Sequence, residues 1–242
     1  MRQEKQVALC VTCLVDQVLP EVGVATVQVL RRAGYAVDFP QAQTCCGQPF
    51  FNSGFRQEGI DLAKRTVEIF EEYETVVLPS GSCTAMIRRE YPELLAAWPE
   101  WHHRAGVLAA KTYELSEFLI RHAQWMPTAV APALTVTYHD SCHMCRILGL
   151  QKEPRQLLEK AGCRVCEMEE SDRCCGFGGL FSVRMPEISN AMTAEKLRQA
   201  GDTGADALVT ADPGCLMQIR GLAEGTSLRA EHIATVLEEM TR

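Results

Sequence analysis

Residues 75–83 read TVVLPSGSC, and residues 207–215 read ALVTADPGC. In each stretch, apolar residues typical of a buried strand are followed by a turn containing proline and glycine, and then by a cysteine. A helix is predicted to begin directly after that cysteine, near Thr84 in the first stretch. The two stretches start 132 residues apart, and their common pattern indicates an internal duplication.

The duplication extends toward the N-terminus through six further cysteines. A double cysteine followed by glycine stands at 45–47 and again at 174–176, and in both copies a single cysteine precedes it after 31 intervening residues. Two unrelated disulfide or core patterns would not be expected to keep this register. We therefore interpret the repeated thiols as two soft-metal sites. Their candidate ligands are Cys13, Cys45, Cys46 and Cys83 in the first copy, and Cys142, Cys174, Cys175 and Cys215 in the second.

The hydrophobic periodicity alternates between strand and helix in both copies. Strands are predicted at residues 7–13, 36–39, 75–78, 134–138, 163–168, 207–210 and 228–230, and helices at 20–33, 57–72, 152–161, 187–199 and 232–240. Such alternation is typical of parallel sheets with right-handed crossovers. We expect an α/β protein of two similar lobes, residues 1–129 and 130–242, each a small parallel sheet flanked by helices and related by a pseudo-twofold axis. Residues 124–133 (QWMPTAVAPA) are the predicted linker.

The cysteines follow predicted strands, and ligands collect at the carboxyl ends of the strands in an open parallel sheet. Four thiols are therefore expected to meet in each lobe, with the strand ends facing a shared cleft. Four thiolates are the usual protein ligands of a [4Fe–4S] cluster. The helices predicted after Cys83 and Cys215 would lower the pKa of these thiols through their free N–H groups. Gly47 and Gly176 would supply the turn that lets two adjacent cysteines share one site.

Composition narrows the class of protein. The chain has 242 residues, twelve cysteines, 47% hydrophobic residues and a net charge of −7. A chain of this size can form a core without disulfides, so its thiols are expected to stay free in a reducing cytoplasm. No stretch reaches the roughly 18 to 20 apolar residues of a membrane span. The negative net charge argues against nucleic acid as a binding partner. With neither a G-x-G-x-x-G nor a Walker loop, no flavin or nicotinamide site is expected.

The cysteine motifs resemble those of the CCG cysteine-rich domain, which occurs in heterodisulfide reductases, glycolate oxidase iron–sulfur subunits and related proteins. The resemblance covers nearly the whole chain and is closest to small two-domain members of bacterial lactate oxidation systems. Its motifs are TCLVD (12–16), CCGQP (45–49), SGSC (80–83), SCHM (141–144), CCGFGG (174–179) and GCLM (214–217). The wider family ends its motif in C-x-x-C, where this chain has Met86 and Gln218. Four matching thiols per lobe favour a four-thiolate cluster, or a labile site, over the non-cubane cluster of heterodisulfide reductase.

The resemblance implies an iron–sulfur electron-transfer subunit of a cytoplasmic complex that oxidises L-lactate to pyruvate. It implies up to two clusters, one per lobe, with the eight repeated cysteines as ligands. The implied partners are the other subunits, including a ferredoxin-like iron–sulfur protein, and a small 2-hydroxy acid. No residue is assigned to catalysis, since either a CCG cluster or a cofactor of another subunit must accept the two electrons of lactate.

Two other functions remain open. One is a thiol–disulfide protein similar to heterodisulfide reductase, in which one of the double cysteines reacts directly. The other is a zinc-stabilised scaffold, because positions 10 and 13, and positions 142 and 145, have the C-x-x-C spacing of zinc sites. These pairs are not equivalent in the repeat, since Cys10 aligns with His139 and Cys145 with Asp16. The C-x-x-C spacing nevertheless makes zinc in one of the two sites a further expectation.

The remaining polar residues near the motifs have simpler interpretations. Cys145 is a possible spare ligand, and three unrepeated cysteines on predicted strands are expected in the core: Cys10, Cys163 and Cys166. Two histidines flank Cys142 and are expected to be hydrogen-bonding loop histidines, with a role as metal ligand or proton donor as the alternative: His139 and His143. Two aspartates beside the repeated cysteines are expected to cap helices, with an oxygen ligand to an iron as the alternative: Asp16 and Asp140.

Overall fold

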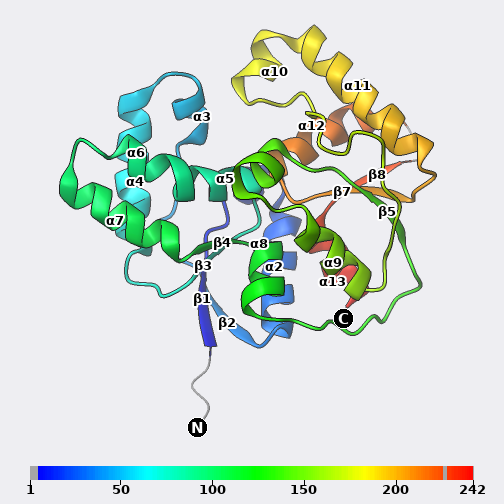
Figure 1. Cartoon of the computed structure of the whole chain (residues 1–242), viewed down its shortest axis with the longest axis horizontal. Coiled ribbons are helices and arrows are strands. Elements are labelled where there is room, and N and C mark those ends of the chain that lie inside the picture. Colours follow the sequence, from blue (N-terminus) through cyan, green and yellow to red (C-terminus); the bar gives the residue numbers. More distant parts are fainter. Residues whose placement is uncertain (1–4, 226–227, 242) are drawn as a thin grey trace.

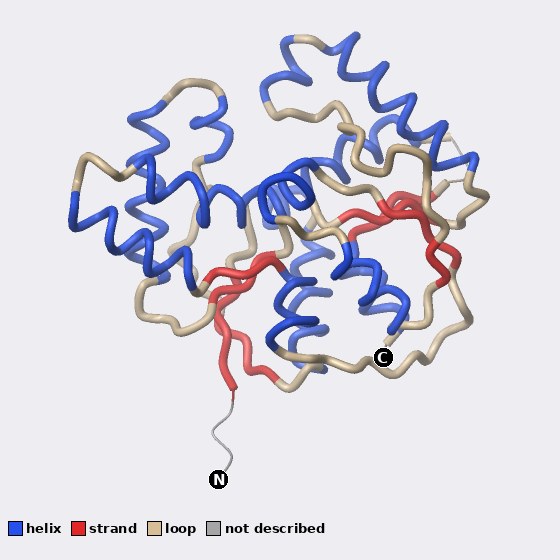
Figure 2. The backbone as a smooth tube through the Cα atoms, viewed as in Figure 1, coloured by secondary structure: helices blue, strands red, loops and turns tan. Residues whose placement is uncertain are grey.

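The computed structural model describes residues 5–225 and 228–241, which form two four-stranded sheets (Figures 1 and 2). All neighbouring strands are parallel. The first sheet has the order β2-β1-β3-β4 and comprises β1 (Lys5–Leu9), β2 (Tyr35–Asp38), β3 (Val76–Leu78) and β4 (Thr112–Glu114). The second has the equivalent order β6-β5-β7-β8 and comprises β5 (Thr135–Tyr138), β6 (Arg164–Val165), β7 (Ala207–Thr210) and β8 (Arg229–His232). The predicted fold class, two similar α/β lobes, is confirmed, while the boundary at residue 130 stays a prediction.

Helices connect the strands of both sheets (Figure 1). In the first lobe they are α1 (Cys13–Val18), α2 (Pro20–Arg32), α3 (Gln48–Asn52), α4 (Arg56–Phe70), α5 (Gly81–Ala85), the π-helix η1 (Met86–Glu90), α6 (Tyr91–Leu94), α7 (Pro99–Ala110), α8 (Leu115–Glu117) and the π-helix η2 (Phe118–His122). In the second they are the π-helix η3 (His143–Leu148), α9 (Lys152–Lys160), α10 (Leu180–Arg184), α11 (Pro186–Asp202), α12 (Pro213–Ala223) and α13 (Ile233–Met240). The five helices predicted from periodicity correspond to α2, α4, α9, α11 and α13. Within the two described ranges, none of these helices is long and apolar enough to cross a membrane.

The strands next to the cysteines are shorter than predicted. β1 ends at Leu9, so Cys13 begins a helix instead of ending a strand. β6 has two residues, and Cys163 and Cys166 lie directly outside it. Short strands suffice here because helices pack against both sheets.

The helices that carry the last repeated cysteines begin earlier than predicted. α5 starts at Gly81 and α12 at Pro213, so Cys83 and Cys215 lie inside the first turn instead of ahead of it. A side chain before each helix explains the early start: Ser80 and Asp212 both accept a hydrogen bond from a backbone N–H of the first turn. Such N-caps satisfy donors that the helix itself cannot pair.

The two lobes pack through equivalent elements. α2 of the first lobe contacts α13 of the second, and their repeat counterparts α9 and α8–η2 contact each other. Likewise α5 contacts η3, and α1 contacts α12. Buried apolar side chains of α2 and α13, such as Val22 and Leu237, belong to one continuous core that spans both lobes. This reciprocal packing is what a pseudo-twofold relation requires, and burial of apolar surface stabilises it.

Candidate metal centres

The first lobe brings together the four repeated thiols predicted for it. Cys13 opens α1 just beyond β1. Cys45 and Cys46 follow β2, and Cys83 follows β3. The Sγ atoms of Cys13 and Cys45 lie 3.7 Å apart, and those of Cys46 and Cys83 lie 3.2 Å apart. The thiols of Cys45 and Cys46 also interact, which links the two pairs into a chain of four sulfurs.

A turn at Gly47 lets the double cysteine of the first lobe face one site. Gly47 has φ +85°, a conformation that other residues adopt only with strain, and its N–H lies 3.4 Å from the Sγ of Cys45. The Tyr91 hydroxyl, which is buried, donates a hydrogen bond of 2.7 Å to the carbonyl of Cys46. Tyr91 was not singled out from the sequence, because its role depends on how α6 packs against this turn.

The second lobe holds its double cysteine in the same way. Gly176 has φ +93°, and its N–H lies 3.4 Å from the Sγ of Cys174. Here Thr193 of α11 donates a hydrogen bond of 2.7 Å to the carbonyl of Cys175. The Cys175 thiol interacts with both Cys174 and Cys215, so these sulfurs also form one group.

The remaining thiol of the second lobe, Cys142, lies between this group and a histidine. Cys174 and burial both affect the Cys142 thiol, with burial the larger cause of its raised pKa. The Nδ1 atom of His143 lies 3.5 Å from the Cys142 Sγ, and its Nε2 atom lies 2.9 Å from the side-chain nitrogen of Gln48 in the other lobe. His143 therefore has polar contacts as expected, but it begins the helix η3 instead of lying in a loop, and one contact reaches the other lobe.

His139 differs from that expectation. It is fully buried, and neither of its ring nitrogens has a hydrogen-bond partner within the described ranges. A ring nitrogen of His139 and the Sγ atoms of Cys175 and Cys215 lie within 4.8 Å of one another, a grouping that could hold a metal ion. Burial lowers the pKa of His139 to about 3, which keeps the imidazole neutral. The prediction of a hydrogen-bonded loop histidine is wrong at this position because β5 carries the ring into the interior.

The pKa values of the clustered thiols differ from one another. Hydrogen bonds from Cys13 and Cys46 lower the pKa of Cys45 to about 3, while the pKa of Cys13 is raised because its own proton is shared with Cys45. A hydrogen bond with Cys175 lowers the pKa of Cys215, but burial and nearby negative charges raise it to about 11. The helix was predicted to lower the pKa of Cys215, but burial and nearby negative charges outweigh this effect. Metal binding at such thiols displaces protons.

Two segments of the chain, residues 7–88 and 136–220, match the family described as "CCG: Cysteine-rich domain". The chain belongs to the CCG family. Three similar proteins share the name "Lactate utilization protein A". The relative from Halalkalibacterium halodurans is 47% identical over 240 residues, which covers 98% of each chain. Those from Shouchella clausii and Bacillus subtilis are 49% and 46% identical, and each alignment covers 96% of this chain and 98% of the relative.

A solved structure supports the fold of this CCG protein. The crystal structure of a hypothetical protein from Helicobacter pylori matches 99% of the chain with a TM-score of 0.72. The sequences are 10% identical, and the chain spans 49% of that protein's length. At this identity the similarity concerns the fold alone.

The donor groups of this CCG protein fit a soft-metal centre in each lobe. Each lobe offers four thiols at the ends of parallel strands, and the second adds an imidazole without a partner among the described residues. Thiolate and imidazole are the ligands that iron–sulfur clusters and zinc accept. The N–H groups of Gly47 and Gly176 lie close to a sulfur in each lobe, where they can stabilise negative charge.

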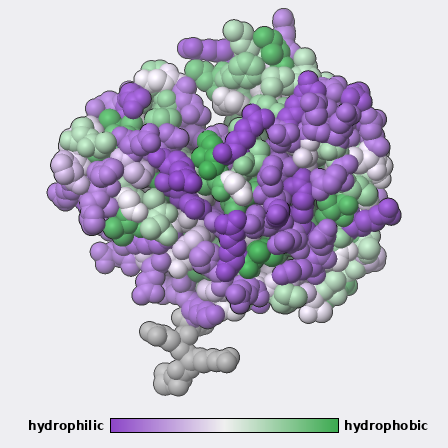
Figure 3. Space-filling model, in the orientation of Figure 1, coloured by the Kyte–Doolittle hydropathy of each residue, from purple (hydrophilic) through white to green (hydrophobic). Residues whose placement is uncertain are grey.

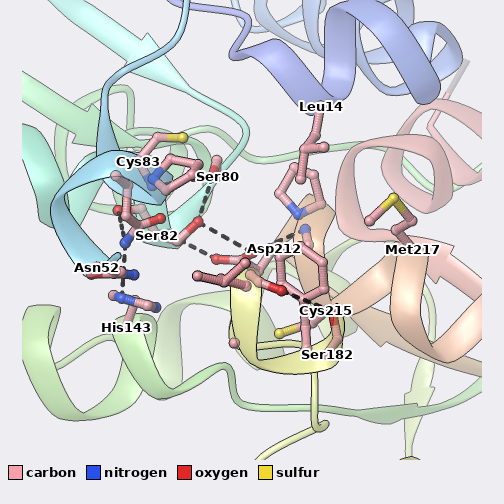
Figure 4. Close-up of a pocket in the computed structure, with 18 of the residues that line it drawn as sticks. Leu14, Asn52, Ser80, Ser82, Cys83, His143, Ser182, Asp212, Cys215 and Met217 are labelled. Carbon is pink, nitrogen blue, oxygen red and sulfur yellow. Dashed lines mark hydrogen bonds between the residues drawn. The ribbon is translucent and has the colours of Figure 1, made fainter. Parts of the chain in front are cut away.

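Both groups of thiols open onto one cavity of about 540 Å³ between the lobes. Seven of the eight repeated cysteines line it, and the eighth, Cys45, lines a smaller neighbouring cavity. Figure 4 shows Cys83 and Cys215 on either side of Asp212. The mouth is apolar, with Phe50 of α3 on one side and Val183 of α10 on the other, and a notch is visible between these helices in Figure 3. The predicted shared cleft is therefore present.

Asp212 is a residue of this region that sequence analysis missed. Its carboxylate accepts a hydrogen bond from the N–H of Gly214 in its own helix and another, of 2.7 Å, from the N–H of Ser82 in the other lobe. It therefore joins α5 and α12, the helices that carry the last repeated cysteine of each lobe (Figure 4). The sequence Asp-Pro-Gly is a typical helix start and could have suggested the cap, though not the contact between lobes.

Neither of the two aspartates predicted as caps has that role. Asp16 lies in the first turn of α1, whose N-cap is Thr12, and its side chain is exposed. Asp140 is buried and accepts two hydrogen bonds of 2.8 Å from Arg155. An ionised carboxylate in the interior is stabilised far more by a paired guanidinium than by a helix end, which explains the difference.

The unrepeated cysteines mostly lie where they were expected. Cys10 and Cys163 are buried in the core, while Cys166 is only half-buried because β6 ends before it. Cys145 lies in η3 and is also half-buried. Its role as a spare ligand stays a prediction.

The two positions where the wider family has a further cysteine are used for packing. Met86 is fully buried in the core of the first lobe. The side-chain amide of Gln218 donates hydrogen bonds to Ser189 (3.1 Å) and Thr193 (3.0 Å) of α11. Gln218 therefore holds the helix that supports the double cysteine of the second lobe.

Proposed function

We propose that this protein is the iron–sulfur electron-transfer subunit of a cytoplasmic complex that oxidises L-lactate to pyruvate. The observation that carries the proposal is the arrangement of two four-thiol groups around one cavity between the lobes. Four thiolates commonly hold a [4Fe–4S] cluster, so each lobe offers the ligands of one. The name shared by the relatives supports lactate as the substrate of the complex.

The proposed ligands are the eight repeated cysteines. When bound, the clusters would supply one-electron redox chemistry, and the chain's own groups would set their environment. The N–H groups of Gly47 and Gly176 would stabilise the charged sulfurs of Cys45 and Cys174. The apolar mouth would limit access of water to the centres.

The cavity supports electron transfer more than lactate binding. Proteins generally bind a carboxylate through arginine or lysine, and neither is among the described residues that line this cavity. The one carboxylate among those lining residues, Asp212, would repel an anion. We therefore propose that lactate binds to a partner subunit, where it loses two electrons and two protons. The electrons would pass between this protein and a ferredoxin-like iron–sulfur partner.

A zinc-stabilised scaffold is the second candidate, favoured by one distance in the first lobe. Tetrahedral zinc with Zn–S bonds of about 2.3 Å places its sulfurs roughly 3.8 Å apart. The Sγ atoms of Cys13 and Cys45 lie 3.7 Å apart. This spacing suits a single metal ion in the first lobe, so metal analysis must include zinc.

Metal and acid-labile sulfide content of protein purified without oxygen tests both candidates. The proposal expects iron and sulfide in near-equal amounts and a brown colour that dithionite bleaches. Cys46→Ser and Cys175→Ser should each reduce the iron content to roughly half, because each removes a ligand from one four-thiolate centre. Cys166→Ser is the matched control and should keep full iron, since Cys166 belongs to neither group of thiols.

Two results would count against the proposal. Full iron in both Cys46→Ser and Cys175→Ser would show that the ligand assignment is wrong. Colourless protein with zinc or no metal after anaerobic reconstitution would show that the iron–sulfur function is wrong.

A further inference from the structure

We propose that His139 is a nitrogen ligand of the second-lobe centre, a fifth donor beside the four repeated thiols. This inference rests on the proposed function, in which the second lobe holds an iron–sulfur centre. The distance limit of 4.8 Å among a His139 ring nitrogen, the Cys175 Sγ and the Cys215 Sγ places the imidazole within the reach of a shared metal group.

The unmet hydrogen-bonding capacity of His139 supports this role. The side chain is fully buried and lines the cavity between the lobes, yet neither ring nitrogen has a hydrogen-bond partner among the described residues. Leaving such a buried polar atom unpaired is unfavourable, and binding to a metal would remove that cost. The other fully buried histidine, His232, uses its Nδ1 atom to accept a hydrogen bond from the N–H of Ala234. Both ring nitrogens of His139 are thus without a partner among the described residues, whereas His232 has only its Nε2 atom unpaired.

The surroundings of the ring decide which of its nitrogens can bind a metal. Histidines that bind metals usually donate their second N–H to a backbone carbonyl or a carboxylate. No such partner is present for His139 among the described residues, so either ring nitrogen is available to the thiol group.

The duplication places a donor at the same point of the first lobe. Both residues follow the first strand of their sheet: the N–H of Cys10 bonds to the carbonyl of Val77 (3.0 Å), and the N–H of His139 bonds to that of Val209 (2.8 Å). Cys10 is buried and packs in the same cluster as Cys83. Cys10 therefore occupies in the first lobe the position that His139 occupies in the second.

Isotope labelling of histidine tests the assignment in the intact protein. Pulsed EPR of the reduced, anaerobic protein should show a directly coordinated nitrogen whose coupling changes from the ¹⁴N to the ¹⁵N pattern when only histidine is labelled. The coupling should vanish in His139→Cys, which copies the donor of the first lobe, and persist in the matched control His143→Gln. The wild-type labelling result does not depend on the folding of any variant.

The outcomes separate this inference from the proposed function. Full iron and sulfide without a histidine coupling would overturn the role of His139 and leave the iron–sulfur function standing. A coupling lost in His143→Gln and kept in His139→Cys would also overturn it. Protein without iron and sulfide after reconstitution would overturn both.

Discussion

Gly176 shows how closely the double cysteine is tied to its support. A Cβ atom at this position would lie 2.4 Å from the carbonyl oxygen of Ser189 and 3.0 Å from the Oγ1 atom of Thr193. The carbonyl of Cys175 accepts a hydrogen bond from Thr193 of α11, so a shift of α11 or of the turn would displace Cys175. At this residue the glycine is required both by its φ and by the space around it.

Gly176→Ala should therefore destabilise the second lobe and reduce its metal content. The expected loss is about 1–3 kcal/mol in the free energy of unfolding, because positive φ and a backbone clash act together. Urea unfolding and iron analysis of the variant measure both effects.

Gly179→Ala is the matched control in the same loop. Gly179 also has positive φ, but a Cβ there would meet no atom within 4 Å. A smaller loss of stability and unchanged iron are expected. Equal effects in the two variants would show that the contact with α11 is unimportant.

At the scale of the elements, the helix after the fourth strand begins in the same way in both lobes. Glu114 caps α8 by accepting hydrogen bonds from the N–H groups of Ser116 and Glu117. His232 caps α13 in the equivalent place. Both caps are fully buried, so burial favours the neutral form of each: it raises the pKa of Glu114 to about 8 and lowers that of His232 to about 4.

Glu114 should make stability depend on pH. Its pKa in the folded protein is about 8, against an ordinary value of 4.5, so the folded state keeps a proton that the unfolded state has lost between these values. The contribution of Glu114 to the free energy of unfolding should therefore fall as pH rises from about 4.5 to 8, by an amount on the order of a few kcal/mol. The lowered pKa values of His139 and His232 act in the opposite direction up to about pH 6.5, so the contribution of Glu114 is measured as a difference between two proteins. Urea unfolding of the wild type and of Glu114→Gln at pH 5.5 and 8 gives this difference.

Glu114→Gln isolates the contribution of this carboxyl. The amide keeps an oxygen that can accept the two N–H bonds, but it cannot ionise. The variant should be more stable than the wild type at pH 8, and its advantage over the wild type should be smaller at pH 5.5. If the free energy of unfolding differed between wild type and variant by the same amount at both pH values, the pH dependence could not come from Glu114.

At the scale of the whole molecule, the lobes are joined by a buried carboxylate as well as by apolar packing. Asp212 is 3% exposed and accepts the N–H of Ser82 across the interface. By contrast, the ion pair between Arg32 of α2 and Glu238 of α13, at 2.8 Å, is partly exposed. Solvent screens the exposed pair far more than the buried contact.

Asp212→Asn should weaken the interface between the lobes. The amide can keep one acceptor, but its NH₂ group would face a backbone N–H in one of the two helices. A loss of about 1–3 kcal/mol in the free energy of unfolding is expected from an unpaired buried donor. Urea unfolding of the iron-loaded protein measures it.

Glu238→Gln is the control for this prediction. It removes the charge of an interlobe ion pair that is partly exposed, so its expected cost is below about 1 kcal/mol. If Asp212→Asn cost no more than Glu238→Gln, the buried contact would not hold the lobes together.

Much of the molecule could be predicted because its pattern is local and repeated. The alternation of strand and helix depends on residues close in sequence, and helices such as α2 and α11 were found for that reason. The grouping of the thiols also follows from sequence, because cysteines after parallel strands meet at one edge of the sheet. The structure groups Cys13 with Cys45 and Cys175 with Cys215 as expected, although their role as ligands stays a proposal.

The amino-acid sequence by itself thus determined the duplication, the parallel α/β lobes and the thiols that gather in each. Only the tertiary structure decided which polar groups of the described residues are left without partners and which are paired across the chain. The unpartnered ring of His139, the pairing of Asp140 with Arg155 and the contact of Asp212 with Ser82 belong to this second kind. The reason is physical: the free energy of a buried polar group depends on what lies within hydrogen-bond reach, and those neighbours come from distant segments brought together by packing.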